Sequence, residues 1–295
     1  MAKLKADRIV PSDLLEYLNT YSDFSFELAV LKMLRESGLN CEHGGLYEDA
    51  VTKKSREFDI RAITTTQRHR VRLAIECKNI RDNFPILISC VPRHEQESYH
   101  QVALVGEPES SSGFINLAIH QSRAKTLSIC GEHSMYKQGE PIGKSTVQVG
   151  RAVDGSISAN DSELYEKWGQ CLSSAVDLVE RIYWDGDKQK TYQSMVIPFV
   201  VVPNDRLWIV LYDEDGNRVT EPKPSNRCPC FIDKDYEMGT KLAGTRMWLS
   251  HVEIVTLNGM RSFVQRYLSS EEAVGQLFPK EGIIAALQRA AETNA

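Results

Sequence analysis

The sequence has no long apolar run, no repeated cysteine pair and no basic tract, and each absence excludes a class of protein. No apolar stretch approaches the roughly 20 residues of a membrane-spanning helix. The first residues lack the apolar core of a secretory signal, so we expect a cytoplasmic protein without a membrane partner. The seven cysteines are odd in number, and only Cys228 and Cys230 stand close together. We therefore expect reduced thiols rather than a disulfide framework or a structural zinc site.

The charge balance is slightly acidic. A net charge of −5 and a pI near 5.9 argue against a surface coated in phosphate contacts. A local basic groove is still compatible with this balance. With 42% hydrophobic and 25% charged residues, a chain of 295 residues has an ordinary globular composition and can bury a sizeable core.

Hydrophobic periodicity and turn residues predict an α/β protein. We expect one domain over residues 1–295, with its core at about 20–90 and 160–260 and an insertion at about 92–160, where the pattern weakens. Residues 213–245 are rich in turn formers. The expected helices are 11–37 in two pieces, 161–184, 259–268 and 280–292; the expected strands are 57–64, 71–78, 83–90, 195–202, 207–212 and 252–257, with 195–202 and 207–212 joined as a hairpin.

The stretch from Arg70 to Lys78 is the most informative part of the chain. Alternate side chains of a strand share a face, so its apolar residues form one side, while Glu76 and Lys78 emerge on the other. A hairpin that turns near residues 67–68 pairs residues whose numbers sum to 135, which places Asp59 opposite Glu76. Two carboxylates and a lysine at one place suit a divalent-metal hydrolase. The alternative is an exposed Glu76–Lys78 ion pair on an edge strand, with Asp59 unrelated, worth about 0 to 1 kcal/mol.

These residues resemble the signature of the PD-(D/E)XK nuclease superfamily, read here as Asp59 followed by Glu76-Cys77-Lys78. Glu27, near the start of an expected helix, matches a glutamate found in many members. The resemblance covers about residues 20–90, and Phe58 stands where the family name has proline. It implies a restriction-endonuclease-like fold, a central mixed sheet flanked by helices, with insertions.

The resemblance also implies a catalytic site. Asp59, Glu76 and the backbone carbonyl of Cys77 would hold Mg²⁺ (or Mn²⁺). Lys78 would orient the attacking water, lower its pKa or stabilise the transition state. Glu27 would be an auxiliary metal or water ligand; its alternative role is to complement the helix dipole.

The implied function is that of a Mg²⁺-dependent nuclease with DNA as its favoured substrate. Its biological role would be defence against foreign DNA. A homodimer or a partner subunit is compatible with this function. A non-catalytic module that binds nucleic acid or a protein, and a metal enzyme of another class, are the alternatives. Arg68, Arg70 and Arg72 near the hairpin tip are either phosphate contacts or part of a solvated loop. On the 161–184 helix, Lys167 or Gln170 could reach the site, although a solvated position is favoured for both.

Overall fold

The computed structural model describes residues 7–49, 52–105, 124–185, 192–239 and 245–279. Its helices are α1 (Pro11–Thr20), α2 (Phe24–Glu36), α4 (Ser162–Ile182), α5 (Leu257–Tyr267) and α6 (Glu271–Gly275). Its strands are β1 (Asn40–Glu48), β2 (Ser55–Thr65), β3 (His69–Cys77), β4 (Ile86–Pro92), β5 (Tyr99–Val105), β6 (Ala124–Cys130), β7 (Pro141–Arg151), β8 (Ile157–Asn160), β9 (Tyr192–Val202), β10 (Leu207–Leu211), β11 (Lys223–Pro224), β12 (Arg227–Glu237) and β13 (Arg246–Thr256).

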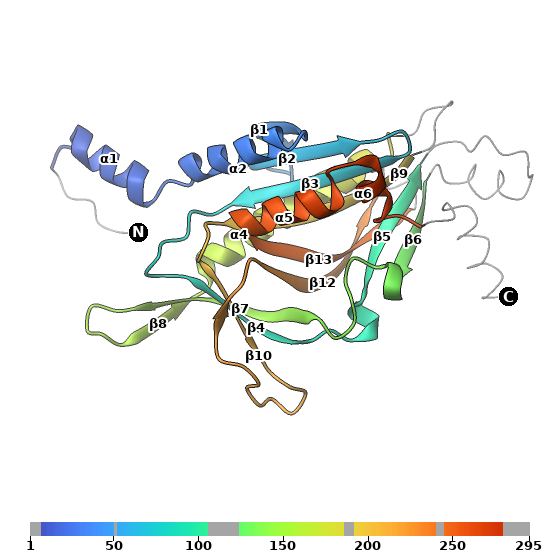
Figure 1. The fold of residues 1–295 in the computed structure, drawn as a ribbon. Helices are drawn as coiled ribbons and strands as arrows, with labels where there is room; N and C mark the ends of the chain where they lie inside the picture. The colour runs from blue at the N-terminus through green and yellow to red at the C-terminus, as the bar shows by residue number, and fades with distance from the viewer. Residues whose placement is uncertain (1–6, 50–51, 106–123, 186–191, 240–244, 280–295) are drawn as a thin grey trace, which may run out of the picture.

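The described strands form one mixed sheet (Figure 1). Its order is β1-β2-β3-β9-β13-β12-β7-β4-β10-β11, with β5 and β6 joined to β9 and β8 joined to β7. Strands β3, β9 and β13 run parallel to one another. Their apolar runs are buried on both faces, as parallel strands covered by helices require.

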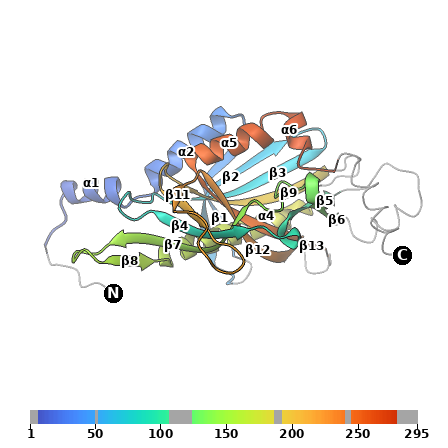
Figure 2. The same cartoon turned by 60° about the horizontal axis from the view of Figure 1, so that its bottom comes forward.

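Helices cover both faces of this sheet. Figure 2 shows α2, α5 and α6 on one face and α4 on the other. On α4, the expected apolar stripe is buried, from Leu164 through Cys171 to Ile182. The Cys171 thiol lies 3.3 Å from the carbonyl of Phe199 in β9, so the helix sits directly on the parallel strands. None of the helices in the described part of the chain combines the length and apolar character needed to cross a bilayer.

The structure confirms the α/β class and the predicted β2–β3 hairpin. Ile60 pairs with Ile75, and the register continues to Thr65 opposite Arg70, so the paired residue numbers sum to 135 as expected. The two-piece helix at 11–37 is also confirmed as α1 and α2.

Strand β3 is not an edge strand, because it lies between β2 and β9. The prediction that residues 195–202 and 207–212 form a hairpin is wrong as well. Both edges of β9 are already occupied along most of its length, by β3, β5 and β13. Strand β10 instead pairs in parallel with β4, elsewhere in the sheet.

Two segments with a weak pattern or many turn formers in the sequence contribute strands to the sheet. In the segment 92–160, which we expected to be an insertion, β5 pairs with β9 and β7 pairs with β4 and β12. In the turn-rich segment 213–245, β12 pairs with β13 despite Pro229 and a bulge between Phe231 and Lys234. Proline and the charges after it conceal this strand in the sequence. The helix expected at 280–292 lies outside the described residues.

Candidate active site

The β2–β3 hairpin brings Asp59 to the end of β3. One step beyond the last pair, Ile60 with Ile75, the register places Asp59 beside Glu76. The Oδ2 atom of Asp59 accepts a hydrogen bond of 2.7 Å from the backbone N–H of Cys77. The carboxylate is thus fixed against the backbone that carries Glu76, as the hairpin prediction requires.

Helix α4 adds a lysine to this pair of carboxylates. The Nζ atom of Lys167 lies 2.9 Å from Asp59 Oδ2 and 3.5 Å from Glu76 Oε2. Burial lowers the pKa of Lys167, but Asp59 and Glu76 raise it by more, so the net direction is upward. Lys167 is therefore a cation throughout the neutral pH range.

Glu76 lies in an environment that disfavours its ionised form. The residue is 0% exposed, and neither carboxylate oxygen accepts a hydrogen bond in the described part of the chain. Burial, followed by the charge of Asp59, raises the pKa of Glu76 well above its usual value, while Lys167 acts in the opposite direction. The alternative of a solvated Glu76–Lys78 ion pair is therefore wrong, because a fully buried carboxyl is not at the surface.

The start of α2 supplies further polar groups. Asp23 accepts a hydrogen bond of 2.7 Å from the N–H of Asn79 and forms an ion pair of 3.3 Å with Lys78. Glu27 Oε2 lies 3.4 Å from His43 Nε2 on β1. Burial and then the charge of Asp59 raise the pKa of Glu27, so its carboxyl is close enough to the pair to sense it.

These oxygen donors suit Mg²⁺ bound by a few carboxylates and water better than a metal ion whose ligands are all protein side chains. Within the described residues, no three His, Cys, Asp or Glu side chains form a ready-made metal centre. Mg²⁺ often takes one or two carboxylates and completes its shell with water and substrate phosphate. Asp59 and Glu76 would supply these carboxylates, and the absence of a hydrogen bond to either oxygen of Glu76 within the described residues is the strongest sign that a cation would be held there.

Comparison with known proteins adds no relative. No family model matches the chain, and no match is found among curated proteins or solved structures. What the site can do therefore follows from its own residues and distances.

The predicted arginine cluster lies at the other end of the hairpin. Arg70 and Arg72 both form ion pairs with Asp185, and Arg70 also stacks 3.9 Å from the centre of the Tyr192 ring. Arg68 is exposed. At about 3.3 Å per residue, four to eight strand positions separate these arginines from Glu76 by roughly 13 to 26 Å. Phosphate contact stays a prediction for Arg68, whereas the guanidinium groups of Arg70 and Arg72 are occupied.

Lys167 is the main site residue whose burial the sequence analysis predicted incorrectly. We expected it to be solvated, yet its side chain is only 16% exposed. The available signal was its place on the helix, one turn before Cys171 of the buried stripe. Gln170 is half-buried, and its backbone carbonyl accepts a hydrogen bond from Tyr47. His43 carried no signal, because its contact with Glu27 depends on how α2 crosses β1.

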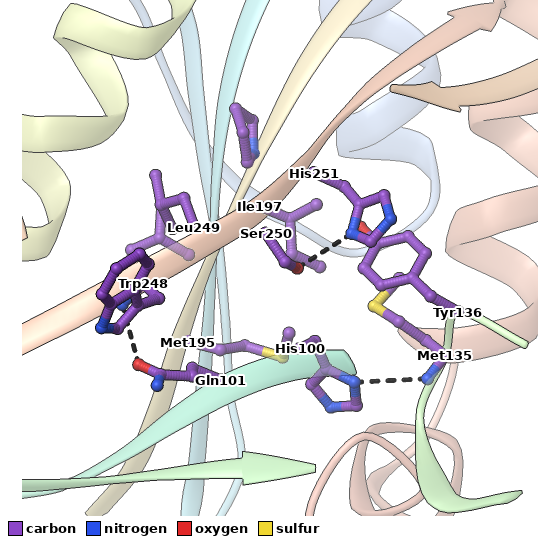
Figure 3. A pocket seen from close by; sticks show the side chains of 12 residues that line it. His100, Gln101, Met135, Tyr136, Met195, Ile197, Trp248, Leu249, Ser250 and His251 are labelled. Atoms are coloured by element: carbon purple, nitrogen blue, oxygen red, sulfur yellow. Dashed lines mark hydrogen bonds between the residues drawn. The ribbon is translucent and has the colours of Figure 1, made fainter. Parts of the chain in front are cut away.

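A second buried polar cluster surrounds His100 and His251 (Figure 3). His100 accepts a hydrogen bond from the N–H of Met135 at Nδ1, so Nε2 carries the proton and donates to the carbonyl of Leu277. His251 stacks on Tyr136 with ring centres 3.6 Å apart. The cavity beside them measures about 10 Å³, room for about one water molecule. This cluster joins segments of the fold and has no space for a substrate.

Proposed function

We propose that this protein is a Mg²⁺-dependent nuclease that hydrolyses phosphodiester bonds, with DNA as its favoured substrate and a restriction-endonuclease-like core. The observation that carries the proposal is the meeting of Asp59, Glu76 and Lys167 at a fully buried carboxyl group, Glu76, whose oxygens accept no hydrogen bond within the described residues. Buried carboxylates that destabilise each other are typical of functional sites. The register of β2 and β3 supports the same conclusion, because it sets the two carboxylates side by side.

The protonation state of each residue determines which catalytic role it can take. A bound Mg²⁺ would lower the pKa of the attacking water and neutralise a phosphoryl oxygen. Lys167 stays protonated, so it does not act as a base and instead stabilises negative charge on the phosphate. Glu27 has a raised pKa and stands beside His43, which suits it to accept the proton of the water.

Two elements project on the side of the molecule where β3 ends. Figures 1 and 2 both show α1 and the β7–β8 hairpin projecting on the same side of the molecule. Strand β3 ends on this side (Figure 1), and Glu76, the second-last residue of β3, is fully buried there. An extended nucleic acid that crosses this side would pass the site.

The deciding experiment is cleavage of plasmid and linear DNA with Mg²⁺ or Mn²⁺. We expect the wild type to cut and Asp59→Asn to abolish cutting. Lys167→Met should reduce the rate by about 100-fold or more, the usual effect of removing one stabilising group. Lys32→Met is the matched control, because Lys32 is 76% exposed on α2 and should not matter.

Lys78→Met separates the two lysines. Lys78 follows the family motif and pairs with Asp23, whereas Lys167 contacts both Asp59 and Glu76. If Lys78→Met abolishes cutting and Lys167→Met does not, the motif lysine is the catalytic one and our assignment of Lys167 is wrong. Unchanged cutting in Asp59→Asn would reject the site as a whole.

A non-catalytic nucleic-acid or protein-binding module is the second candidate. One observation favours it: the Lys167 ammonium already bridges both carboxylates and offsets one of their two negative charges without a metal. Calorimetric titration with Mn²⁺ distinguishes the two. Binding that is lost in Asp59→Asn supports the enzyme, whereas absence of both binding and cutting supports the module.

A further inference from the structure

Residues 9–28 carry apolar surface that the described part of the protein leaves uncovered. Helix α1 has no buried residue, and Figures 1 and 2 show it standing clear of the sheet. We call residues 9–28 the arm. Nine of its large apolar residues are 42% to 64% exposed: Ile9, Val10, Leu14, Leu15, Tyr17, Leu18, Tyr21, Phe24 and Leu28.

The arm needs a partner surface to keep its structure. An isolated helix shorter than about 12 to 15 residues is marginal in water, and α1 has ten. Its local support is a start signal, Pro11 at the first position and the Asp13 carboxylate accepting from the N–H of Val10 at 2.8 Å. Most helical stability in proteins comes from packing of an apolar face, so this face is expected to be covered.

The charges of the arm point to a protein as the partner. Within α1 the charged residues are Asp13 and Glu16, and the last turn carries no basic residue. Anionic lipid surfaces and nucleic acids both attract clusters of Lys and Arg. An acidic helix with a wide apolar face suits neither.

The placement of the apolar residues fits a second copy of the same arm. The patch runs over two helices: Leu14 and Tyr17 lie on α1, and Phe24 and Leu28 lie on α2, beyond the turn at residues 21–23. A twofold axis places the same patch on both subunits, so each copy can cover the apolar surface of the other. The stacked rings of Tyr17 and Tyr21, with centres 6.4 Å apart, lie in the middle of the patch.

Charge fixes the direction of the pairing. The acidic residues Asp13 and Glu16 lie at the start of the arm, whereas the Arg81 guanidinium lies 5.5 Å from the Tyr21 ring at the far end of α1. Arg81 is exposed. An antiparallel arrangement brings Glu16 of each copy toward Arg81 of the other, and a parallel one does not.

The available area is sufficient for a stable dimer. Nine large apolar side chains, each about half exposed, offer on the order of 800 Å² per copy, which matches the contribution of one partner to a standard interface. We propose that residues 9–28 form an antiparallel, twofold interface with the same segment of a second copy. The inference does not depend on the nuclease proposal.

Analytical ultracentrifugation of the full chain tests the interface. We expect the wild type to be dimeric at micromolar concentration, and Leu14→Glu combined with Leu18→Glu to weaken association by at least 100-fold. Both residues are more than half exposed, so the double variant should keep the wild-type circular dichroism of the sheet. The control Val153→Glu, at an exposed apolar residue next to the β7–β8 turn, should stay dimeric.

Three results would overturn the proposal. They are a monomeric wild type, a double variant that stays dimeric, and a dimer that depends on residues 280–295 but not on Leu14 and Leu18. The direction of pairing has its own test: Glu16→Arg and Arg81→Glu should each weaken the dimer about 10-fold, and the two together should restore it. Additive weakening in the double charge variant would reject the antiparallel arrangement.

Discussion

At the scale of a single residue, the surroundings of Glu76 disfavour the ionised form of its carboxyl group. A buried carboxylate without hydrogen-bond donors is costly, and an adjacent carboxylate adds to that cost. Lys167 offsets part of it from 3.5 Å. A site of this kind reduces stability, which is typical of groups kept for function rather than for folding.

Replacing Glu76 by glutamine should therefore stabilise the metal-free protein. Because its folded pKa is raised, Glu76 contributes most stability below its ordinary pKa of about 4.5 and loses it as the pH rises through the raised value. We expect Glu76→Gln to gain about 1 to 3 kcal/mol at pH 8 and almost nothing at pH 4.5, measured by urea denaturation in EDTA. A loss of stability at pH 8 would contradict the assigned pKa direction.

A matched variant and a metal titration complete this test. Glu36→Gln changes a glutamate side chain that is 67% exposed and should stay within about 0.5 kcal/mol of the wild type. Added Mn²⁺ should raise the melting temperature of the wild type but not that of Glu76→Gln. An equal rise in both proteins would place the metal elsewhere.

At the scale of elements, Gly143 shows how closely three strands approach. It pairs with Cys90 of β4 on one side and Cys230 of β12 on the other. A Cβ atom at this position would lie 2.4 Å from the Cys230 sulfur and 2.8 Å from Cγ2 of Ile88. The missing side chain therefore leaves the space that the Cys230 sulfur and the Ile88 side chain occupy.

Alanine at two glycines should have opposite effects. Gly143→Ala overpacks the sheet and should cost about 1 to 3 kcal/mol of unfolding free energy. Gly169→Ala lies on the exposed side of α4, where an added Cβ meets nothing within 4 Å, and should gain up to about 1 kcal/mol from helix propensity. Chemical denaturation of the two variants provides the measurement. Equal effects of the same sign would show that β4, β7 and β12 are less closely packed than described.

For the whole molecule, the buried histidines lower the stability of the fold in acid. Burial lowers the pKa of His100 to about 4, and burial with the positive charge of Arg93 lowers that of His251 to about 2. Between these values and the unfolded pKa of about 6.5, the unfolded chain binds more protons than the folded one. Stability therefore falls as the pH drops below 6.5, and full protonation of His100 alone is worth on the order of 3 kcal/mol.

Unfolding free energies at pH 4.5, 5.5 and 6.5 test this dependence. We expect His251→Asn to have a shallower acid slope than the wild type, because one buried group no longer has to acquire a charge. His133→Asn, at an exposed histidine, should keep the wild-type slope. The opposing slope of Glu76 is present in all three proteins, so it cancels in the comparison. Identical slopes in all three would contradict the role of His251.

The sequence by itself determined the local pairings. The alternation of apolar residues before Glu76 and the turn near Gln67 fixed the β2–β3 register, since a shift of one residue would turn every side chain to the other face. The position of Asp59 beside Glu76 follows from that register. The buried stripe of α4 was predictable for the same reason, because its helical period is a local property.

Only the tertiary structure decided which distant groups complete the site. Lys167 contacts Asp59 although the two are 108 positions apart in the sequence, and Asp185 contacts Arg72 although they are 113 positions apart. Strand β9 pairs with β3 and β13, and β10 pairs with β4, so the short connection between β9 and β10 does not decide their partners. Such contacts leave no periodic trace in the sequence, because they arise only when a helix layer packs on the sheet and sets two remote segments side by side.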